Sequence, residues 1–396
     1  FKTVTGNLSS TLLNKGTLEL DTVGIVDLDD PNNVYVNTDK ASSGIIVDAN
    51  VTVKGTLSDQ IALAGKDQYR GTPGGSTYVV MTNNGTIDLS GDNSIGIYTN
   101  NGVINNNTNI NVTGNGSAGL FGENGTAITN SGNINISNNG VGIYAVSYQD
   151  PQNPETTFGD GTISIVNNGS ITTETSSKAI GIYANNNKTG ALRSSGTLNL
   201  ANGLVDVSLS ESGTGIYSEN NTVIGGGTIS VGENGTGIYA KNSDLNLSNL
   251  TLNLKGDNSL GIYLDSGSNL NMSGTNTANI SGKNNILFYL DSDGIFNQNF
   301  VINAASDTTY SLAYLKNNKI AYDGTVVTNG DGALFYGTNS SITINPTASL
   351  TSTGNNTVGV YVDGLYDNGN SDYEGINKGI INLKDNSAGL YAINGA

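Results

Sequence analysis

The sequence predicts an all-β chain that folds as a right-handed parallel β-helix of roughly 14–16 coils with loop insertions. Two observations lead to this fold class. A five-residue motif returns along the chain at intervals of about 21 to 26 residues. Short stretches of alternating apolar and polar residues begin at Asn-Gly turns ahead of many copies of that motif. Each repeat is too small to bury its apolar side alone, so stacked repeats are expected to share one interior.

The five-residue motif has glycine at its centre, then an aliphatic residue and then an aromatic ring. Its first clear copies are centred on Gly96, Gly119 and Gly142, which are 23 residues apart. We expect Ile95 and Ile97 to face inward and Gly96 to lie where the coil bends or where φ is positive. Later full copies are centred on Gly181, Gly215, Gly237, Gly261, Gly359 and Gly389, and degenerate copies lie at 287–289, 312–314 and 333–335.

One aromatic ring per coil predicts a column of stacked rings along one face of the solenoid. We interpret this column as packing, although a strip of aromatic rings is also suited to binding sugars. The expected members are Tyr98, Phe121, Tyr144, Tyr183, Tyr217, Tyr239, Tyr263 and Tyr289.

The alternating stretches have the period of a strand. In Thr86–Leu89, Ile87 and Leu89 point to one side and Asp88 to the other. A helical period is nearly absent, and the one candidate is a short turn near Asp59–Ala64. Equivalent strands of successive coils are therefore expected to pair in parallel, about 4.8 Å apart.

Composition narrows the classes of function. The net charge is −17 and the 16 Lys and Arg residues are scattered, so nucleic-acid binding and attachment to an anionic membrane are not expected. No apolar run is long enough to span a membrane as a helix. The chain opens Phe1-Lys2-Thr3, without Met or a signal peptide, and we expect it to be a processed or excised piece.

Residues with catalytic or metal-binding chemistry are few. The chain has no Cys and no His, which excludes Ser-His-Asp and Cys-His arrangements, and it has no phosphate-binding Gly-Lys-Ser/Thr loop. The segment Asp291–Gly294 resembles the start of a calcium loop but lacks the bidentate Glu. Acidic residues are dispersed, so we expect no enzyme, no cofactor and no metal. A glycan-cleaving β-helix enzyme stays as an alternative.

We expect a single β-helix over residues 1–396, interrupted by insertions at about 54–81, 146–161 and 365–375. Insertions in a solenoid fall on its loops and often on its binding face. Aromatic rings beside carboxylates suit recognition of a glycan or a protein, although such loops can also be tolerated, solvated insertions. The candidate binding residues are Tyr148, Asp150, Phe158, Asp160, Tyr366, Asp367, Tyr373 and Glu374.

The repeats resemble a known family. The Asn-Gly turns, the recurring Gly-Ile-Tyr (as in Asn258–Tyr263) and the absence of Cys are similar to the passengers of large type V autotransporter adhesins. The Asn- and Ile-rich composition of the repeats is most similar to the fusobacterial RadD-like outer-membrane adhesins. A chain without Cys also suits export through a narrow pore in the unfolded state.

The resemblance implies export through a C-terminal β-barrel and display on the outer membrane. It also implies that the passenger, expected to be monomeric, binds host receptors, glycans or other bacteria. A structural stalk that holds another module away from the cell is the main alternative. The insertions favour the binding role, because a pure spacer has no need of them.

Overall fold

The structure is a computed structural model in which the regular elements of the described residues are all β-strands. The chain divides into two compact units, the first formed by Phe1–Ser210 and Thr214–Ile224 and the second by Glu211–Gly213 and Gly225–Ala396. The structure describes residues 11–13, 16–20, 37–38, 44–66, 80–148, 162–174, 176–187, 196–305, 307–364, 373–394 and 396.

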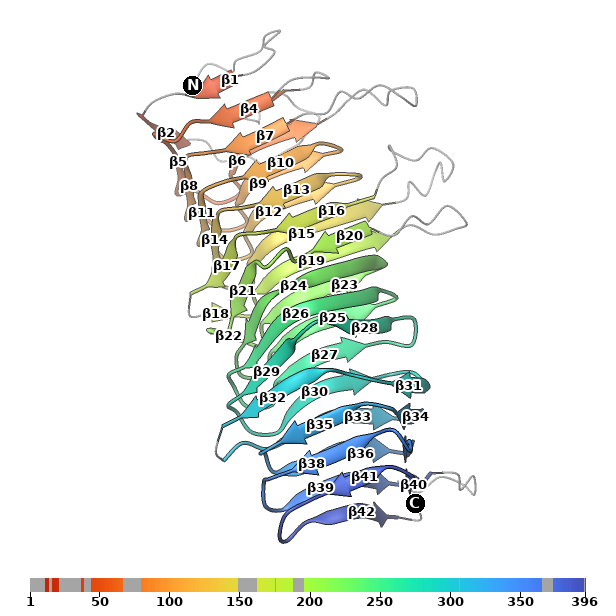
Figure 1. The fold of residues 1–396 in the computed structure, drawn as a ribbon. Helices are drawn as coiled ribbons and strands as arrows, with labels where there is room; N and C mark the ends of the chain where they lie inside the picture. The colour runs from red at the N-terminus through yellow and green to blue at the C-terminus, as the bar shows by residue number, and fades with distance from the viewer. Residues whose placement is uncertain are drawn as a thin grey trace. The chain divides into compact units, whose positions relative to one another are not determined.

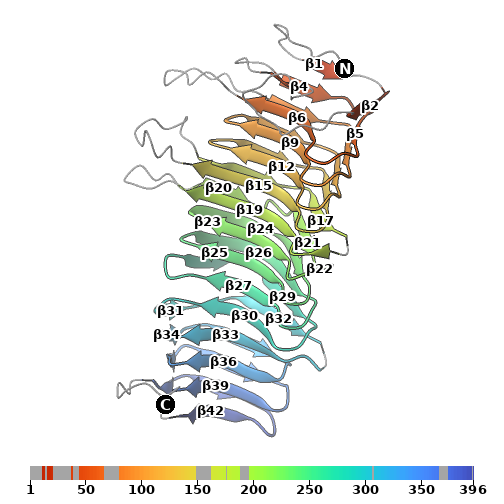
Figure 2. The same cartoon turned by 180° about the vertical axis from the view of Figure 1, so that it is seen from behind.

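In the first unit each coil contributes one short strand to each of three walls (Figures 1 and 2). The pairs of successive coils are parallel. The first wall contains β1 (Thr11–Leu13), β4 (Gly44–Val47), β7 (Val80–Asn83), β10 (Val103–Asn106), β13 (Ala127–Asn130), β16 (Ser164–Asn167), β20 (Gly196–Asn199) and the start of β24 (Asn221–Val231). The second wall contains β2 (Gly16–Leu20), β5 (Val51–Gly55), β8 (Thr86–Leu89), β11 (Asn109–Val112), β14 (Asn133–Ile136), β17 (Ser170–Thr173) and β21 (Leu204–Val207). The third wall contains β3 (Asn37–Thr38), β6 (Ile61–Lys66), β9 (Ile95–Asn100), β12 (Ala118–Glu123), β15 (Val141–Tyr148), β19 (Ile180–Asn187) and β23 (Thr214–Glu219), and a two-residue strand, β18 (Ser176–Ser177), follows β17.

The second unit repeats this plan, and the strand pairs among its described residues are parallel as well. Its first wall contains the first half of β26 (Asp244–Leu254), β28 (Asn269–Ser273), β31 (Gly294–Phe296), β34 (Lys319–Tyr322), β37 (Ser341–Ile344) and β40 (Gly375–Asn377). Its second wall contains the second half of β26, β29 (Asn276–Ile280), β32 (Phe300–Ala304), β35 (Thr325–Thr328), β38 (Ser349–Ser352) and β41 (Ile380–Asn382). Its third wall contains β25 (Thr236–Lys241), β27 (Leu260–Leu264), β30 (Asn285–Leu290), β33 (Tyr310–Lys316), β36 (Gly332–Thr338), β39 (Thr357–Asp363) and β42 (Ala388–Ile393), and the short β22 is Ser210–Glu211.

The predicted fold class is confirmed: the chain is a parallel β-helix. One third-wall strand per coil gives 14 coils in the described residues, the lower end of the predicted range. The motif isoleucines lie in the interior, as predicted, and full burial of one such side chain stabilises the fold by about 1.5–3 kcal/mol. Those with no exposed surface are Ile97, Ile143, Ile182 and Ile216 in the first unit and Ile238 and Ile262 in the second.

The motif glycines lie at a bend where two coils approach closely. Strands β12 and β15 pair through Ala118↔Val141 and Leu120↔Ile143, so the glycine between them falls out of the pairing. A Cβ on Gly142 would come within 2.6 Å of the carbonyl oxygen of Gly181 in the next coil. Gly142 has no positive φ, so the close approach of the next coil is the feature that requires glycine here.

Two details of the predicted motif are corrected. Ile95 does not face the interior: it is half-buried and packs with Tyr98 and Ile61 in a small cluster, because the bend turns its side chain away. The degenerate copy at 333–335 is shifted by one residue, since Tyr336 pairs with Tyr314 whereas Phe335 pairs with Ala313 and is fully buried.

The stretch near Asp59–Ala64 is a turn followed by a strand, not a helical turn: Asp59 lies in the turn with a φ of 60°. Ile61–Lys66 forms β6, and its Leu63 pairs with Ile97 of β9. It is a copy of the motif in which Ala62 and Ala64 replace the glycine and the aromatic ring. Much of the predicted insertion at 54–81 is therefore regular coil, and residues 67–79 lie outside the described residues.

Candidate functional site

The candidate residues of the 146–161 insertion are mostly not placed by the structure. Strand β15 continues through Tyr148, and Val146 and Ser147 are buried within it, so any loop begins after Tyr148. The side chain of Tyr148 lies outside the described residues. So do Asp150, Phe158 and Asp160. This candidate site stays a prediction.

The second insertion is described only at its end. Tyr366 and Asp367 lie outside the described residues, whereas Tyr373 is half-buried and Glu374 is exposed. The carbonyl oxygen of Glu374 accepts a hydrogen bond from the backbone N–H of Ile342, at 2.9 Å. That contact fixes the chain where it re-enters the first wall just before β40.

A column of aromatic rings is present in each unit, but its first members do not stack: Tyr98 and Phe121, and then Phe121 and Tyr144, meet edge to face with centroids 5.3 and 4.8 Å apart. In the first unit Tyr144, Tyr183 and Tyr217 stack with centroids 4.9 and 4.7 Å apart and planes within 7°. In the second unit Tyr239 and Tyr263 stack at 4.5 Å. A ligand that stacks on an aromatic ring needs an open ring face, and here neighbouring rings cover the faces. The geometry favours the packing interpretation over a sugar-binding strip.

Hydroxyl groups at the edge of the column pair with carboxylates. The hydroxyl of Tyr217 donates to Oε2 of Glu219 at 2.7 Å, and that of Tyr263 donates to Oδ2 of Asp291 at 3.3 Å. Burial, together with the neighbouring Tyr239 and the Asp291 carboxylate, raises the pKa of Tyr263. These contacts fix the rings, so they too belong to packing.

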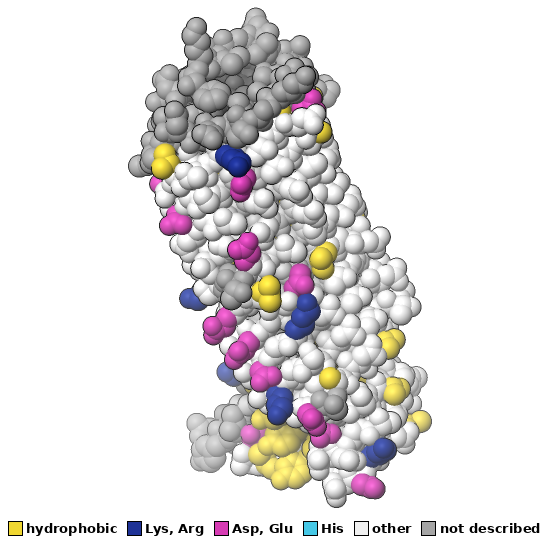
Figure 3. Space-filling model, turned by 90° about the vertical axis from the view of Figure 1, so that its left-hand side faces the viewer, with side chains coloured by type: hydrophobic (Ala, Val, Ile, Leu, Met, Phe, Trp, Pro, Cys, Tyr) yellow, Lys and Arg dark blue, Asp and Glu magenta, His cyan; other side chains and the backbone are white. Residues whose placement is uncertain are grey.

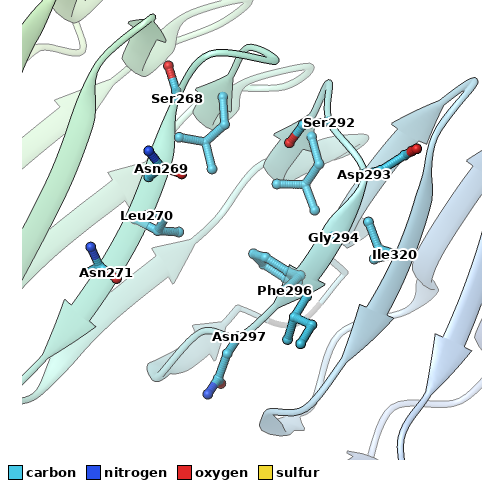
Figure 4. Close-up of a pocket in the computed structure, with 13 residues that line it drawn as sticks. Ser268, Asn269, Leu270, Asn271, Ser292, Asp293, Gly294, Phe296, Asn297 and Ile320 are labelled. Carbon is cyan, nitrogen blue, oxygen red and sulfur yellow. The ribbon is translucent and has the colours of Figure 1, made fainter.

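The structure reveals a groove in the second unit that the sequence did not indicate. Strand β28 pairs with β26, and β31 pairs with β34, but β28 and β31 belong to different sheets. On the other two walls the same coils stay joined, because β27 pairs with β30 and β29 with β32. The first wall is therefore open between β28 and β31, and a cavity of about 300 Å³ occupies the opening (Figure 4).

Gly294 is a local cause of this opening. In the register of the first wall Gly294 pairs with Ile320, whose side chain is buried, so Gly294 stands at an inward position without a side chain. A Cβ at Gly294 would have no atom within 4 Å, and its φ of +142° is one that other residues rarely adopt. The only signal of this opening in the sequence is Asp291–Gly294, the segment that resembles the start of a calcium loop.

The groove has an apolar floor and a polar rim (Figure 4). Leu270 is half-buried here, whereas Leu245, its partner on β26, is fully buried. The floor consists of the half-buried Leu270 and of buried core side chains that line the cavity: Leu264, Leu290, Phe296 and Ile320. The rim consists of Ser268, Asn269, Asn271, Ser292, Asp293 and Asn297, with the 76% exposed Ile295 beside them.

A second break in the unit is closed by a side chain. Strands β32 and β35 of the second wall also lie in different sheets. There the amide of Asn329 takes the place of a strand edge: its Oδ1 accepts from the N–H of Ala304 at 3.2 Å, and its Nδ2 donates to the carbonyl of Ala304 at 2.8 Å. Between β28 and β31 the side-chain bridge lies only at the far end, beyond both strands: Nδ2 of Asn299 donates to the carbonyl of Gly274 at 3.1 Å, and Oδ1 of Asn299 accepts from Nδ2 of Asn276 at 2.7 Å. The described residues contain no such bridge between the two strands themselves.

The surface is mainly uncharged and polar. On the face seen in Figure 3, uncharged side chains and backbone cover most of the surface, and acidic and basic side chains lie among them, several beside one another. Within the described part of the chain no group of three or more acidic residues has the arrangement of a metal site. No helix that could span a membrane is present among those residues either.

Comparisons with known proteins give a limited match. No protein-family model matches the chain, and no curated protein matches it. Among solved structures the chain is similar to the Streptococcus pneumoniae surface protein and adhesin PfbA, with 10% sequence identity and a TM-score of 0.21. That similarity covers 98% of this chain and 92% of the other. The fold assignment here rests on the strand pairing itself.

Proposed function

We propose that the chain is a non-enzymatic binding segment displayed at a bacterial cell surface, in the manner of an adhesin. The observation that carries this proposal is the groove between β28 and β31. A solenoid that serves only as a spacer is stabilised by keeping every wall paired. Here one wall is open and leaves core side chains such as Leu270 accessible behind a polar rim. Pockets with an apolar floor and a few polar groups are typical of binding sites.

The finer assignment rests on the resemblance of the repeats. We propose export by the type V autotransporter route, display on the outer membrane, and binding to host receptors, glycans or other bacteria. The Asn-Gly turns and the absence of Cys support this route. No cofactor or metal is part of the proposal.

An adhesion experiment tests the proposed function. Beads coated with the protein are incubated with epithelial and bacterial cells, and the soluble protein is applied to a glycan array whose eluate is analysed for cleavage products. We expect retention on at least one cell type or glycan without release of product. Cleavage products would contradict the proposal in favour of an enzyme, and an absence of retention on all surfaces would favour the stalk.

Two variants test whether the groove makes the contact with the bound cell or glycan. Leu270→Trp fills the floor of the groove and is expected to weaken retention at least tenfold, a loss of about 1.4 kcal/mol. The matched control is Val301→Trp, because Val301 is 53% exposed on β32 and does not line the groove. Unchanged retention by Leu270→Trp would remove the groove from the proposal.

The predicted contact at 146–161 is tested by deletion of 149–160. The deletion spares β15 and shortens the interval between Gly142 and Gly181 from 39 to 27 residues, one more than the longest regular interval of about 26. The protein is expected to fold and to lose a further part of its retention. Full retention would remove this loop from the contact.

A further inference from the structure

We propose that the groove between β28 and β31 binds an extended segment of a partner protein by β-strand addition, and that this segment carries a lysine or arginine. This inference rests on the proposed binding function and names the class of partner. The segment would pair with both strand edges and would span about five residues, the length of β28.

The edge of β28 that faces the groove presents backbone groups without a strand partner. The N–H of Asn269 donates to the carbonyl of Ser243 at 3.1 Å, so the backbone groups of Asn269 point away from the groove, toward β26. Successive residues of a strand point their backbone groups to opposite sides. The N–H and C=O groups of Leu270 and Met272 therefore point into the space between β28 and β31.

The edge of β31 that faces the groove also presents backbone N–H and C=O groups without a strand partner. The carbonyl of Phe296 accepts from the N–H of Asp323 at 3.2 Å, so the backbone groups of Phe296 face the next coil. By the same alternation the N–H and C=O of Ile295 face β28. Backbone N–H and C=O groups need hydrogen-bond partners, and a strand with an unpaired edge is a ready template for another strand. Two such edges on one groove favour a strand over any other occupant.

The side chains of the groove set the character of the segment. In an extended segment every second side chain would point to the floor, toward Leu270, Phe296 and the space left by Gly294. Apolar side chains fit those positions. The remaining side chains would point outward, over the amides of Asn271 and Asn297.

The charge of the groove favours a basic segment. Asp293 is the one charged residue in the lining, it is exposed, and the whole chain has a net charge of −17. Figure 4 shows Ser268, Ser292 and Asp293 at one end of the groove and Asn271 and Asn297 toward the other. A segment that runs parallel to β28 would begin near Asp293, so a lysine or arginine near its N-terminal end is complementary.

A selection from random heptapeptides displayed on phage tests the inference with the full 396-residue chain. Peptides are selected on the wild-type protein and counter-selected on Leu270→Trp, whose floor is filled. We expect enriched peptides that alternate apolar and polar residues and carry Lys or Arg in the first half. An absence of enrichment, or equal enrichment on the filled variant, would overturn the proposal.

A pair of substitutions then tests the backbone pairing with the best enriched peptide. Met272→Pro removes an N–H that faces the groove and that β26 does not use, whereas Met272→Ala shortens the same side chain and keeps the N–H. We expect the proline variant to bind the peptide at least tenfold more weakly than the alanine variant, with both variants folded by circular dichroism. Equal affinities would show that the peptide does not pair with β28.

The charge is tested by Asp293→Asn, which is expected to abolish the preference for a basic over a neutral peptide. The same preference in Asp293→Asn would contradict the charge assignment.

The outcome of these peptide experiments can be distinguished from the outcome of the adhesion experiment. A protein that adheres to cells or binds glycans through the groove but yields no groove peptide would refute strand addition and leave the binding function in place.

Discussion

At the scale of single residues, the motif glycines are required because the coils stack closely on one another. The sequence indicated that these positions need glycine but left open whether a bend or a positive φ requires it. The structure shows that the next coil occupies the space of a side chain. At Gly142 a Cβ would clash with Cγ2 of Ile171 and would lie 2.6 Å from the carbonyl oxygen of Gly181. Such contacts depend on the neighbouring coil. The sequence around one glycine therefore cannot show that close approach of the next coil, and not a positive φ, is what requires the glycine.

The equivalent glycine of the last coil provides a matched control. Gly389 occupies the same motif position, but a Cβ there would meet no atom within 4 Å. We expect Gly142→Ala to lower the free energy of unfolding by about 1–3 kcal/mol through overpacking, and Gly389→Ala to change it little. Urea unfolding of both variants measures the difference. Equal effects of the two substitutions would show that close approach of coils is not the reason for the glycine.

A buried tyrosine predicts how stability depends on pH. Tyr322 is fully buried on β34, and burial raises its pKa to about 12, although a hydrogen bond from Nε2 of Gln298 opposes the shift. Below pH 10 both the folded and the unfolded chain keep the proton, so this group does not affect stability. Between about pH 10 and 12 the unfolded chain loses the proton first. The free energy of unfolding therefore falls across that window.

The prediction is a loss of about 1.4 kcal/mol from Tyr322 between pH 9 and pH 11. Tyr322→Phe lacks the ionisable group, so its free energy of unfolding should fall by that much less over the same interval. Urea unfolding at the two pH values measures both proteins. An identical pH dependence of the wild type and Tyr322→Phe would contradict the assignment.

At the scale of elements, the Asn-Gly turns have a second role that the sequence did not reveal. Asparagine was expected to form turns, and most non-glycine residues with positive φ are indeed asparagines. At the end of first-wall strands, however, asparagine side chains are buried in a column. The Nδ2 of Asn83 donates to Oδ1 of Asn106 at 2.9 Å, and the contact repeats to Asn130 and then Asn167, each at 2.8 Å. Turn propensity is local, whereas this column requires the coils to be in register.

The groove was unpredictable for the same reason. The sequence showed Asp291–Gly294 as an acidic tetrapeptide, and its spacing invited comparison with a calcium loop. That Gly294 stands where Ile320 stands in the next coil follows only from the strand register. The loop residues proposed from the sequence are a different case. These residues interrupt the repeat, and most of them lie outside the described residues.

At the scale of the whole molecule, the period of the repeat was sufficient to predict the fold class. A spacing of about 23 residues with one Gly-Ile-Tyr per coil allowed the interior isoleucines and the stacked rings to be named. Each of the two units confirms those positions. The handedness of the coil stays a prediction from the rule for parallel crossovers. The period does not predict where one coil differs from the next. A binding site is expected at such places.

Amide hydrogen exchange across the chain tests the central claim, that a parallel solenoid opens at one wall to form a binding groove. Fully paired strands should exchange slowly, including Leu245 and Leu247 of β26. We predict that the amides of Leu270, Met272 and Ile295 exchange at least about a thousandfold faster than those two, a difference of about 4.1 kcal/mol in the free energy of opening. Protection of Leu270 and Met272 equal to that of Leu245 and Leu247 would show that the wall is closed and would contradict both proposals.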